Sequence, residues 1–245
     1  MLKRMAWKRE YKSDQERFYD DYLHELQLPD AIQRRLPTTQ LRLHQRPFKE
    51  IGFASTVWDS SIVLSRALER WARSNEVPAV ASALRGHHTV ELGAGCGLVG
   101  ITAAVLGARV TLTDLPCNVA LLTRNVEANE AVLHVAPCSL AVRGLDWTAP
   151  LPANIVQGAD LILATDVFYS GCPVEALIKT VQALATPSTQ VVIAVGRNRA
   201  KLDDFMDGMM ADWCVRAVNK ELQLDADYRC DDCDLWILSK KQGLK

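Results

Sequence analysis

The sequence lacks any long hydrophobic run. None of its apolar stretches approaches the roughly 20 residues that cross a bilayer, and no hydrophobic core follows the basic residues of positions 3–12. Acidic residues appear from Glu10 onward, which also argues against a transit peptide. We therefore expect a cytoplasmic protein, with nuclear access as an alternative, that has no membrane partner.

The sequence also lacks a strong net charge and a paired cysteine framework. A net charge of -1 over 245 residues provides no overall attraction to nucleic acid. The cysteines are odd in number, seven in all, which suits a reducing compartment. Cys230 and Cys233 form a single C-x-x-C, with no second pair and no histidine at zinc spacing. These absences predict no nucleic-acid partner and no metal site.

What the sequence does contain is typical of an ordinary globular protein, with 49% hydrophobic and 23% charged residues. Its length suits one domain with a short extension and a substantial core. We expect residues 1–40 to form a helical extension and residues 41–245 to form the main domain. A strand pair is expected within 40–53, and a helix through the apolar positions of 58–71.

From residue 87 onward, strand and helix patterns alternate. Strands are expected near 87–92, 108–113, 133–140, 159–165 and 189–195, and helices near 98–106, 117–129 and 172–185. Such alternation predicts an α/β fold whose parallel sheet is covered on both faces. Two final strands, 213–219 and 234–239, are joined by a polar loop without a helix, so they are expected to form an antiparallel hairpin at the sheet edge.

The most informative segment is 90–100, VELGAGCGLVG, which joins the end of a strand, a glycine turn and the start of a helix. Gly93, Gly95 and Gly97 permit backbone conformations that are closed to other residues. They also let a ligand approach the main chain and the positive end of the following helix. The segment therefore predicts a site for a nucleotide-like cofactor.

Two cofactor families share this pattern. Gly95, Gly97 and Gly100 satisfy the dinucleotide spacing G-x-G-x-x-G, which alone is weak evidence. The next strand ends at Asp114, nineteen residues after Gly95, where a carboxylate can accept hydrogen bonds from the ribose hydroxyls of an adenosine in either family. The C-terminal hairpin favours S-adenosylmethionine (SAM) methyltransferases, since dinucleotide-binding sheets usually continue in parallel.

Several further segments make the likeness specific. They are residues 57–65 (VWDSSIVLS), 113–116 (TDLP), 146–147 (DW), 166–169 (DVFY) and 227–229 (DYR), together with the Asn125–Asn129 helix. With the glycine turn, they make the chain resemble the seven-β-strand protein-lysine methyltransferases, in particular the group that acts on the valosin-containing protein. The likeness runs from about residue 40 to residue 240.

This resemblance implies a Rossmann-like class I methyltransferase sheet, mostly parallel with an antiparallel C-terminal hairpin, and SAM as the methyl donor. It implies a set of cofactor-binding residues, which are Trp58, Glu91, Gly93, Ala94, Gly95, Asp114, Asp146, Trp147 and Thr165. Asp114 would hold the ribose, Asp146 and Trp147 would line the adenine pocket, and Trp58 would close the site from the N-terminal side.

The same resemblance places Asp166 and Tyr169, the D-x-x-Y motif, beside the methyl donor and the target lysine. Asp166 directly follows an apolar strand, at the mouth of an open α/β sheet. We expect Asp166 to orient the lysine and compensate its charge, and Tyr169 and Phe168 to wall the channel. The implied partner is a protein that bears the target lysine, such as a valosin-type ATPase or another chaperone or translation protein, and the implied enzyme is a monomer.

The chain departs from the pattern after its fifth strand. Relatives carry an acidic residue there on the substrate side, whereas this chain has Arg197, whose charge would repel a lysine-rich peptide and favour an acidic one. Two alternatives to a protein methyltransferase stay open, namely a small-molecule N-methyltransferase and a non-catalytic SAM-binding partner protein.

Overall fold

A twisted sheet of seven strands forms the centre of the molecule in the computed structural model, which describes residues 5–74, 84–136, 139–155, 157–197 and 199–241. The strands of this sheet are β3 (His88–Leu92), β4 (Arg109–Asp114), β5 (Ser139–Gly144), β6 (Ala159–Thr165), β7 (Ala185–Val195), β8 (Trp213–Ala217) and β9 (Asp234–Lys240). Their order across the sheet is β5-β4-β3-β6-β7-β9-β8. The first five run parallel, and β9 pairs antiparallel with both β7 and β8, which confirms the expected parallel sheet with its C-terminal hairpin.

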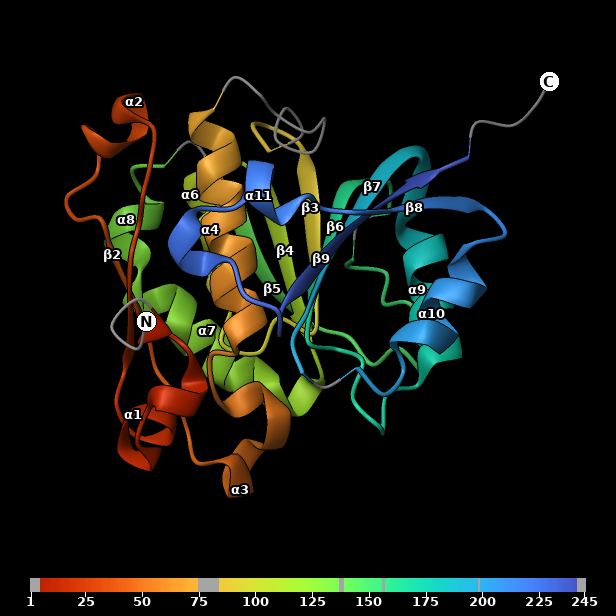
Figure 1. The fold of residues 1–245 in the computed structure, drawn as a ribbon, viewed down its shortest axis with the longest axis horizontal. Coiled ribbons are helices and arrows are strands. Elements are labelled where there is room, and N and C mark those ends of the chain that lie inside the picture. Colours follow the sequence, from red (N-terminus) through yellow and green to blue (C-terminus); the bar gives the residue numbers. More distant parts are fainter. Residues whose placement is uncertain (1–4, 75–83, 137–138, 156, 198, 242–245) are drawn as a thin grey trace.

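Helices cover both faces of this sheet, as Figure 1 shows. One face carries α4 (Asp59–Arg73), α6 (Leu98–Val105) and α7 (Val119–Ala128), and the other carries α9 (Val174–Leu184) and α10 (Leu202–Met209). The central strands β3 and β6 are almost entirely buried, because helices cover them from both sides. Because β3, β4, β6 and β7 run parallel, their carboxyl ends meet at the same edge of the sheet.

The remaining short elements connect these layers. They are α1 (Asp14–Phe18), α2 (Asp30–Gln33), α3 (Phe48–Ile51), α8 (Glu130–Leu133), α11 (Lys220–Gln223), and the 3-10 turns η2 (Arg9–Tyr11), η3 (Gly52–Ser55), η4 (Pro116–Asn118) and η5 (Ala226–Tyr228). Within the described ranges, no helix is long and apolar enough to cross a bilayer.

The N-terminal region differs from its prediction. Strand β1 (Tyr22–Glu25) lies in the region expected to be helical, and it pairs antiparallel with β2 (Gln40–Leu43). The predicted partner of β2, within 40–53, is instead the helical turn α3. The hairpin crosses the boundary drawn at residue 40, and Leu26, Leu28 and Ile32 join the main core, so the extension and the domain share one core.

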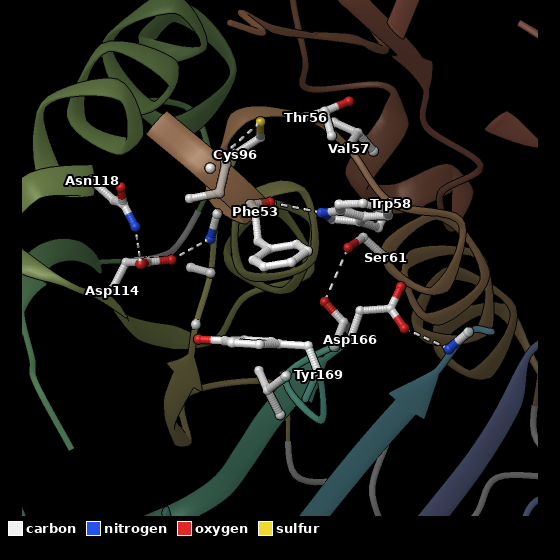
Figure 2. Close-up of a pocket in the computed structure, with 18 of the residues that line it drawn as sticks. Phe53, Thr56, Val57, Trp58, Ser61, Cys96, Asp114, Asn118, Asp166 and Tyr169 are labelled. Atoms are coloured by element: carbon white, nitrogen blue, oxygen red, sulfur yellow. Dashed lines mark hydrogen bonds between the residues drawn. The ribbon is translucent and has the colours of Figure 1, made fainter. Parts of the chain in front are cut away.

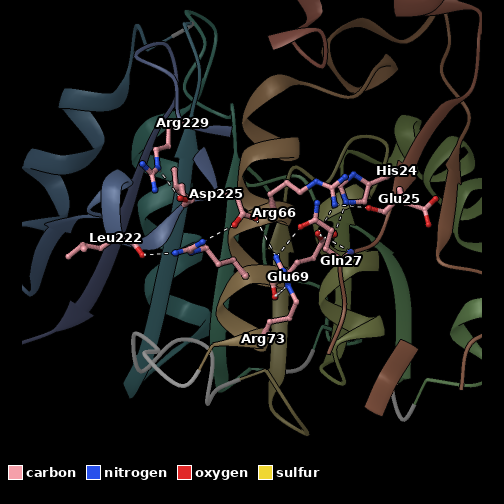
Figure 3. A network of polar contacts seen from close by, with 11 residues as sticks. His24, Glu25, Gln27, Arg66, Glu69, Arg73, Leu222, Asp225 and Arg229 are labelled. Carbon is pink, nitrogen blue, oxygen red and sulfur yellow. Dashed lines mark hydrogen bonds and ion pairs between the residues drawn. The ribbon is translucent and has the colours of Figure 1, made fainter. Parts of the chain in front are cut away.

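A buried polar network fastens this hairpin to α4 (Figure 3). The carboxylate of Glu69 lies 2.7 Å from His24 Nε2 and accepts a hydrogen bond from Arg66 Nη1 over 2.7 Å. The side chains of His24 and Glu69 are fully buried. Burial lowers the pKa of His24, while the hydrogen bond to Glu69 opposes that change. Charged groups removed from water need such partners, so this network holds the extension in place.

Two predictions in the main domain were also wrong in detail, and one helix was not predicted. The strand expected at 133–140 begins only at Ser139, because Glu130–Leu133 forms the helical turn α8. Helix α10 was not predicted, although its buried Leu202, Phe205, Met206 and Met209 have helical spacing. The loop between the last two strands contains α11, whose backbone N–H groups are capped by Asn219.

Candidate active site

The glycine turn between β3 and α6 has the conformation that its sequence requires. Gly93 and Gly95 have φ values of 66° and 54°, in the left-handed region that disfavours other residues. A Cβ on Gly93 would lie only 2.8 Å from Val167 Cγ1, so the strand ends of β3 and β6 approach more closely than a larger residue allows. The turn thus leaves its main chain exposed toward the cavity described below.

Asp114, the last residue of β4, faces this turn. Its Oδ2 accepts a hydrogen bond from Gly95 N over 2.7 Å, and its Oδ1 accepts from Leu115 N over 2.8 Å and from Asn118 Nδ2 over 2.7 Å. These donors fix the plane of a carboxylate that is only 7% exposed. Asn118 was not predicted as a site residue. The sequence feature that could have identified it is an amide side chain four residues after Asp114, in the turn η4.

Glu91 does not have the predicted cofactor-binding position. It is not among the residues that line the cavity, its side chain is 1% exposed, and its Oε2 accepts a hydrogen bond from Gly100 N over 2.8 Å. Burial raises the pKa of the Glu91 carboxyl to about 8. The residue therefore supports the start of α6 from beneath, because β3 directs its side chain under the glycine turn and not toward the cavity.

One cavity of about 520 Å³ lies at the carboxyl edge of the sheet, a size within the usual range of small-molecule sites. Apart from Glu91, every predicted site residue lines it, namely Trp58, Gly93, Ala94, Gly95, Asp114, Asp146, Trp147, Thr165, Asp166 and Tyr169. Figure 2 shows Asp114 and Asn118 on one side of the cavity and Asp166 on the other, with two aromatic rings between them. Tertiary folding thus brings together residues from widely separated segments.

Asp166 is held firmly at the end of β6. Its φ of 51° lies in the left-handed region, which is unusual for a residue other than glycine. Ser60 Oγ donates to its Oδ2 over 2.6 Å and Gly196 N donates to its Oδ1 over 2.5 Å. Burial raises the pKa of the Asp166 carboxyl, and these two hydrogen bonds oppose the rise. A strained, pinned carboxylate at a cavity wall is typical of a functional position.

An aromatic pair divides the cavity. The rings of Phe53 and Tyr169 stack with centroids 4.7 Å apart, and Trp58 Nε1 donates to the carbonyl of Phe53 over 2.8 Å. Phe53 was not predicted as a site residue; the sequence signal that could have identified it is an aromatic residue after Gly52, shortly before Trp58. Phe168, which was expected to wall the channel, is instead fully buried against Phe205, because it points to the opposite face from Tyr169.

The other predicted cofactor residues lie around the Asp114 side and the Asp166 side of the cavity. Thr165 Oγ1 lies 3.0 Å from Ser61 Oγ, which joins the end of β6 to α4. The carboxylate of Asp146 accepts hydrogen bonds from the backbone and the hydroxyl of Thr148, so the loop after β5 has a fixed shape. The ring of Trp147 approaches Gly93, where a Cβ would lie 3.5 Å from it. This end of the cavity offers a flat apolar wall beside polar groups.

Four charged side chains meet beside the cavity, and three of them, Glu10, Arg197 and Asp232, line it. Arg197 Nη2 lies 2.6 Å from Glu10 Oε2 and 3.1 Å from Asp232 Oδ2, and Lys8 contacts both carboxylates as well. Hydrogen bonds from Arg197 and Lys8 lower the pKa of Asp232 to about 2. The two cations are thus balanced by two anions, and the expected repulsion of basic peptides by Arg197 loses its electrostatic basis. Within the described part of the chain, no cluster of three His, Cys, Asp or Glu side chains is placed to bind a metal.

The arrangement fits an adenosine-containing cofactor that carries a positive charge. A glycine turn with exposed main chain, a fixed carboxylate at the next strand end and an aromatic wall suit a nucleoside. Six carboxyl side chains line the same cavity beside two arginines, Arg9 and Arg197, and this excess of acidic groups favours a cation; the six are Glu10, Asp59, Asp114, Asp146, Asp166 and Asp232.

Comparisons with known proteins agree with this geometry. The model of a family described as lysine methyltransferase matches residues 35–212. The protein N-lysine methyltransferase METTL21A of Mus musculus is 34% identical over 188 residues, which cover 77% of this chain and 80% of that protein. The EEF1A lysine methyltransferase 3 of Xenopus tropicalis is 31% identical over 156 residues, which cover 64% of this chain and 63% of that protein.

A solved structure shows the same fold at low identity. It is the 16S rRNA N2 G1207 methyltransferase of T. thermophilus in complex with AdoMet and guanosine, with a TM-score of 0.59 and 17% identity. The similarity covers 90% of this chain and 50% of that one.

Proposed function

Because the chain belongs to the lysine methyltransferase family, we propose that Asp166 and Tyr169 shape the reacting end of its cavity and that the glycine-turn end holds the cofactor. The family transfers a methyl group from SAM to the side-chain amine of a lysine in a protein. The observation that carries our proposal is the position of the pinned Asp166 carboxylate, on the opposite side of the aromatic pair from Asp114.

The cofactor end is assigned by its hydrogen-bonding groups. Asp114 would accept the ribose hydroxyls, since its three N–H partners orient the carboxylate and leave acceptor capacity. Asp146 and Trp147 would hold the adenine, and the main chain of Gly93, Ala94 and Gly95 would face the rest of the cofactor. When bound there, SAM supplies a methyl group carried on a sulfonium, a cation that the face of Trp58 attracts.

The target amine has to be neutral when it reacts. A free lysine has a pKa of about 10.4, so deprotonation near pH 7.4 costs roughly 4 kcal/mol. An amine that enters alongside the stacked rings of Phe53 and Tyr169 loses part of its hydration, which disfavours its charged form. Its proton leaves to water before the side chain is enclosed. Asp166 then orients the neutral amine by accepting one of its N–H groups, and this alignment supplies much of the rate.

We infer that the substrate is a folded protein of the chaperone or translation machinery, or a valosin-type ATPase, that presents its lysine at the mouth. The Xenopus relative is named an EEF1A lysine methyltransferase, which supports a protein as the class of substrate. The near-neutral net charge of the chain favours a protein over a nucleic acid as partner. We further propose that the enzyme is monomeric and works in the cytoplasm.

The test incubates the purified protein and SAM labelled with a tritiated methyl group with extract of the source cells, beside Asp166→Asn. We expect a discrete labelled protein band that Asp166→Asn abolishes while SAM affinity, measured by calorimetry, changes less than threefold. The matched control is Asp204→Asn, since Asp204 of α10 pairs with Lys201 and neither side chain is among those that line the cavity. It should label the band as strongly as the unchanged protein.

Two outcomes would contradict the proposal. Equal labelling by Asp166→Asn would show that this carboxylate does not act in the reaction. Intact SAM binding without any labelled protein would point to a small-molecule substrate or a non-catalytic partner.

A further inference from the structure

The segment Trp7-Lys8-Arg9-Glu10, here called the N-terminal wall, precedes the region matched by the family model, which begins at residue 35. It is nevertheless anchored against the far end of the chain. Trp7 Nε1 donates to the carbonyl of Asp227 over 2.8 Å, and the Trp7 ring lies 5.3 Å from that of Tyr228. Arg9 and Glu10 line the cavity, so a segment outside the family match completes the site.

Arg9 makes the most specific contacts of this wall. Its guanidinium carbon lies 4.6 Å from the centroid of the Trp58 ring, and its Nη1 donates to Thr56 Oγ1 over 2.7 Å. Its backbone N–H donates to Asp59 Oδ1 over 2.8 Å, at the start of α4. One residue therefore contacts three positions of the strip 56–59, which borders the cavity.

The Trp58 ring has few other restraints. It lies at the N-terminus of α4, only half-buried, and its indole N–H reaches the carbonyl of Phe53. Without Arg9, the ring would lose the cation over its face and would be held by its hydrogen bond and its ring contact with Phe53, whose ring centroid lies 6.3 Å away. A guanidinium, which remains charged in proteins, attracts the face of an indole more strongly than that of the other aromatic rings.

We propose that Arg9 is a positioning residue for SAM binding, which acts by holding Trp58 in the cavity wall. The inference rests on the proposed role of Trp58 as a cofactor-binding residue. A partly desolvated cation–π contact corresponds to about 2- to 30-fold in an equilibrium constant. Loss of Arg9 should therefore weaken SAM binding by about tenfold, within that range.

A double-mutant cycle with Arg9→Ala, Trp58→Ala and the double variant tests this mechanism. The measurements are the SAM dissociation constant by calorimetry and the kcat and KM for SAM, with the labelled band in cell extract as readout. Arg9→Ala is expected to raise the dissociation constant and the KM about tenfold, as estimated above, with kcat little changed. In the Trp58→Ala background, removing Arg9 should raise the SAM dissociation constant by less than twofold, because the ring that Arg9 holds is absent.

Two further variants separate positioning from general stability. Arg9→Lys keeps a cation above the ring and should restore most of the SAM affinity. Arg42→Ala removes an arginine that pairs with Asp21 in the same N-terminal region, away from the cavity lining. It should leave SAM affinity unchanged.

The outcomes distinguish this inference from the function on which it rests. If Trp58→Ala leaves SAM affinity unchanged, the proposed role of Trp58 is wrong, and the inference falls with it. If Trp58→Ala weakens binding but Arg9→Ala does not, or if the two effects are fully additive, the role of Trp58 stands and the inference about Arg9 is overturned.

Discussion

Replacement of Glu91 by glutamine offers a quantitative test of how the glycine turn is supported. Glu91 is 1% exposed and accepts a hydrogen bond from Gly100 N, and its burial raises its pKa from the ordinary 4.5 to about 8. Because the folded-state pKa is raised, stability from the neutral carboxyl is fully present below pH 4.5 and is lost as the pH rises through about 8. Glutamine has the same shape and does not titrate.

The magnitude follows from the two pKa values. Between them, each pH unit changes the free energy of unfolding by about 1.4 kcal/mol. From pH 5 to pH 8, the stability of Glu91→Gln relative to the unchanged protein should therefore rise by about 4 kcal/mol, as an order of magnitude. Other titrating groups contribute equally to both proteins and cancel in the difference.

Urea unfolding of the two SAM-free proteins at several pH values between 5 and 8 measures this difference. Glu127→Gln, which removes a carboxylate from the exposed face of α7, controls for the loss of a charge. A difference that does not change with pH would refute the reasoning that burial keeps Glu91 neutral. SAM affinity provides a second check. If Glu91 only supports the turn, Glu91→Gln should weaken SAM binding by less than about threefold, whereas a direct ligand of SAM should weaken it much more when substituted.

Three other substitutions have defined expectations. Glu69→Ala should lower the free energy of unfolding by about 3 kcal/mol or more in urea titrations, because it leaves Arg66 buried without its carboxylate, and a loss below 1 kcal/mol would contradict this. Gly93→Ala should lower the free energy of unfolding by about 2–4 kcal/mol in the same urea titrations, because residue 93 has a positive φ and its Cβ would contact Val167. Asp114→Asn should weaken SAM binding by tenfold or more in calorimetry, about 1.4 kcal/mol, because an amide cannot accept hydrogen bonds from all three N–H donors that face the carboxylate. Unchanged SAM affinity would exclude Asp114 as the residue that binds the ribose.

Local patterns in the sequence predicted the elements around the cofactor end. The glycine turn at 93–97 and the acidic strand end at Asp114 are short-range signals, because steric freedom and strand length act over a few residues. The parallel strands β3, β4 and β6 were predicted closely for the same reason, since their apolar runs reflect burial on both faces. Residue type alone did not show which way a side chain points, and the errors at Glu91 and Phe168 arise there.

The contacts that depend on distant segments could be decided only by the tertiary structure. The pairing of β1 with β2, the stacking of Phe53 on Tyr169 and the placement of Arg9 over Trp58 each join parts of the chain whose own sequences contain no sign of the partner. The same is true of Arg197, whose charge is balanced by Glu10 and Asp232. The sequence by itself thus determined the cofactor-binding frame, which is built from local conformational preferences and strand burial. Only the folded chain decided the walls and mouth of the cavity, because their energies come from side chains that meet through space.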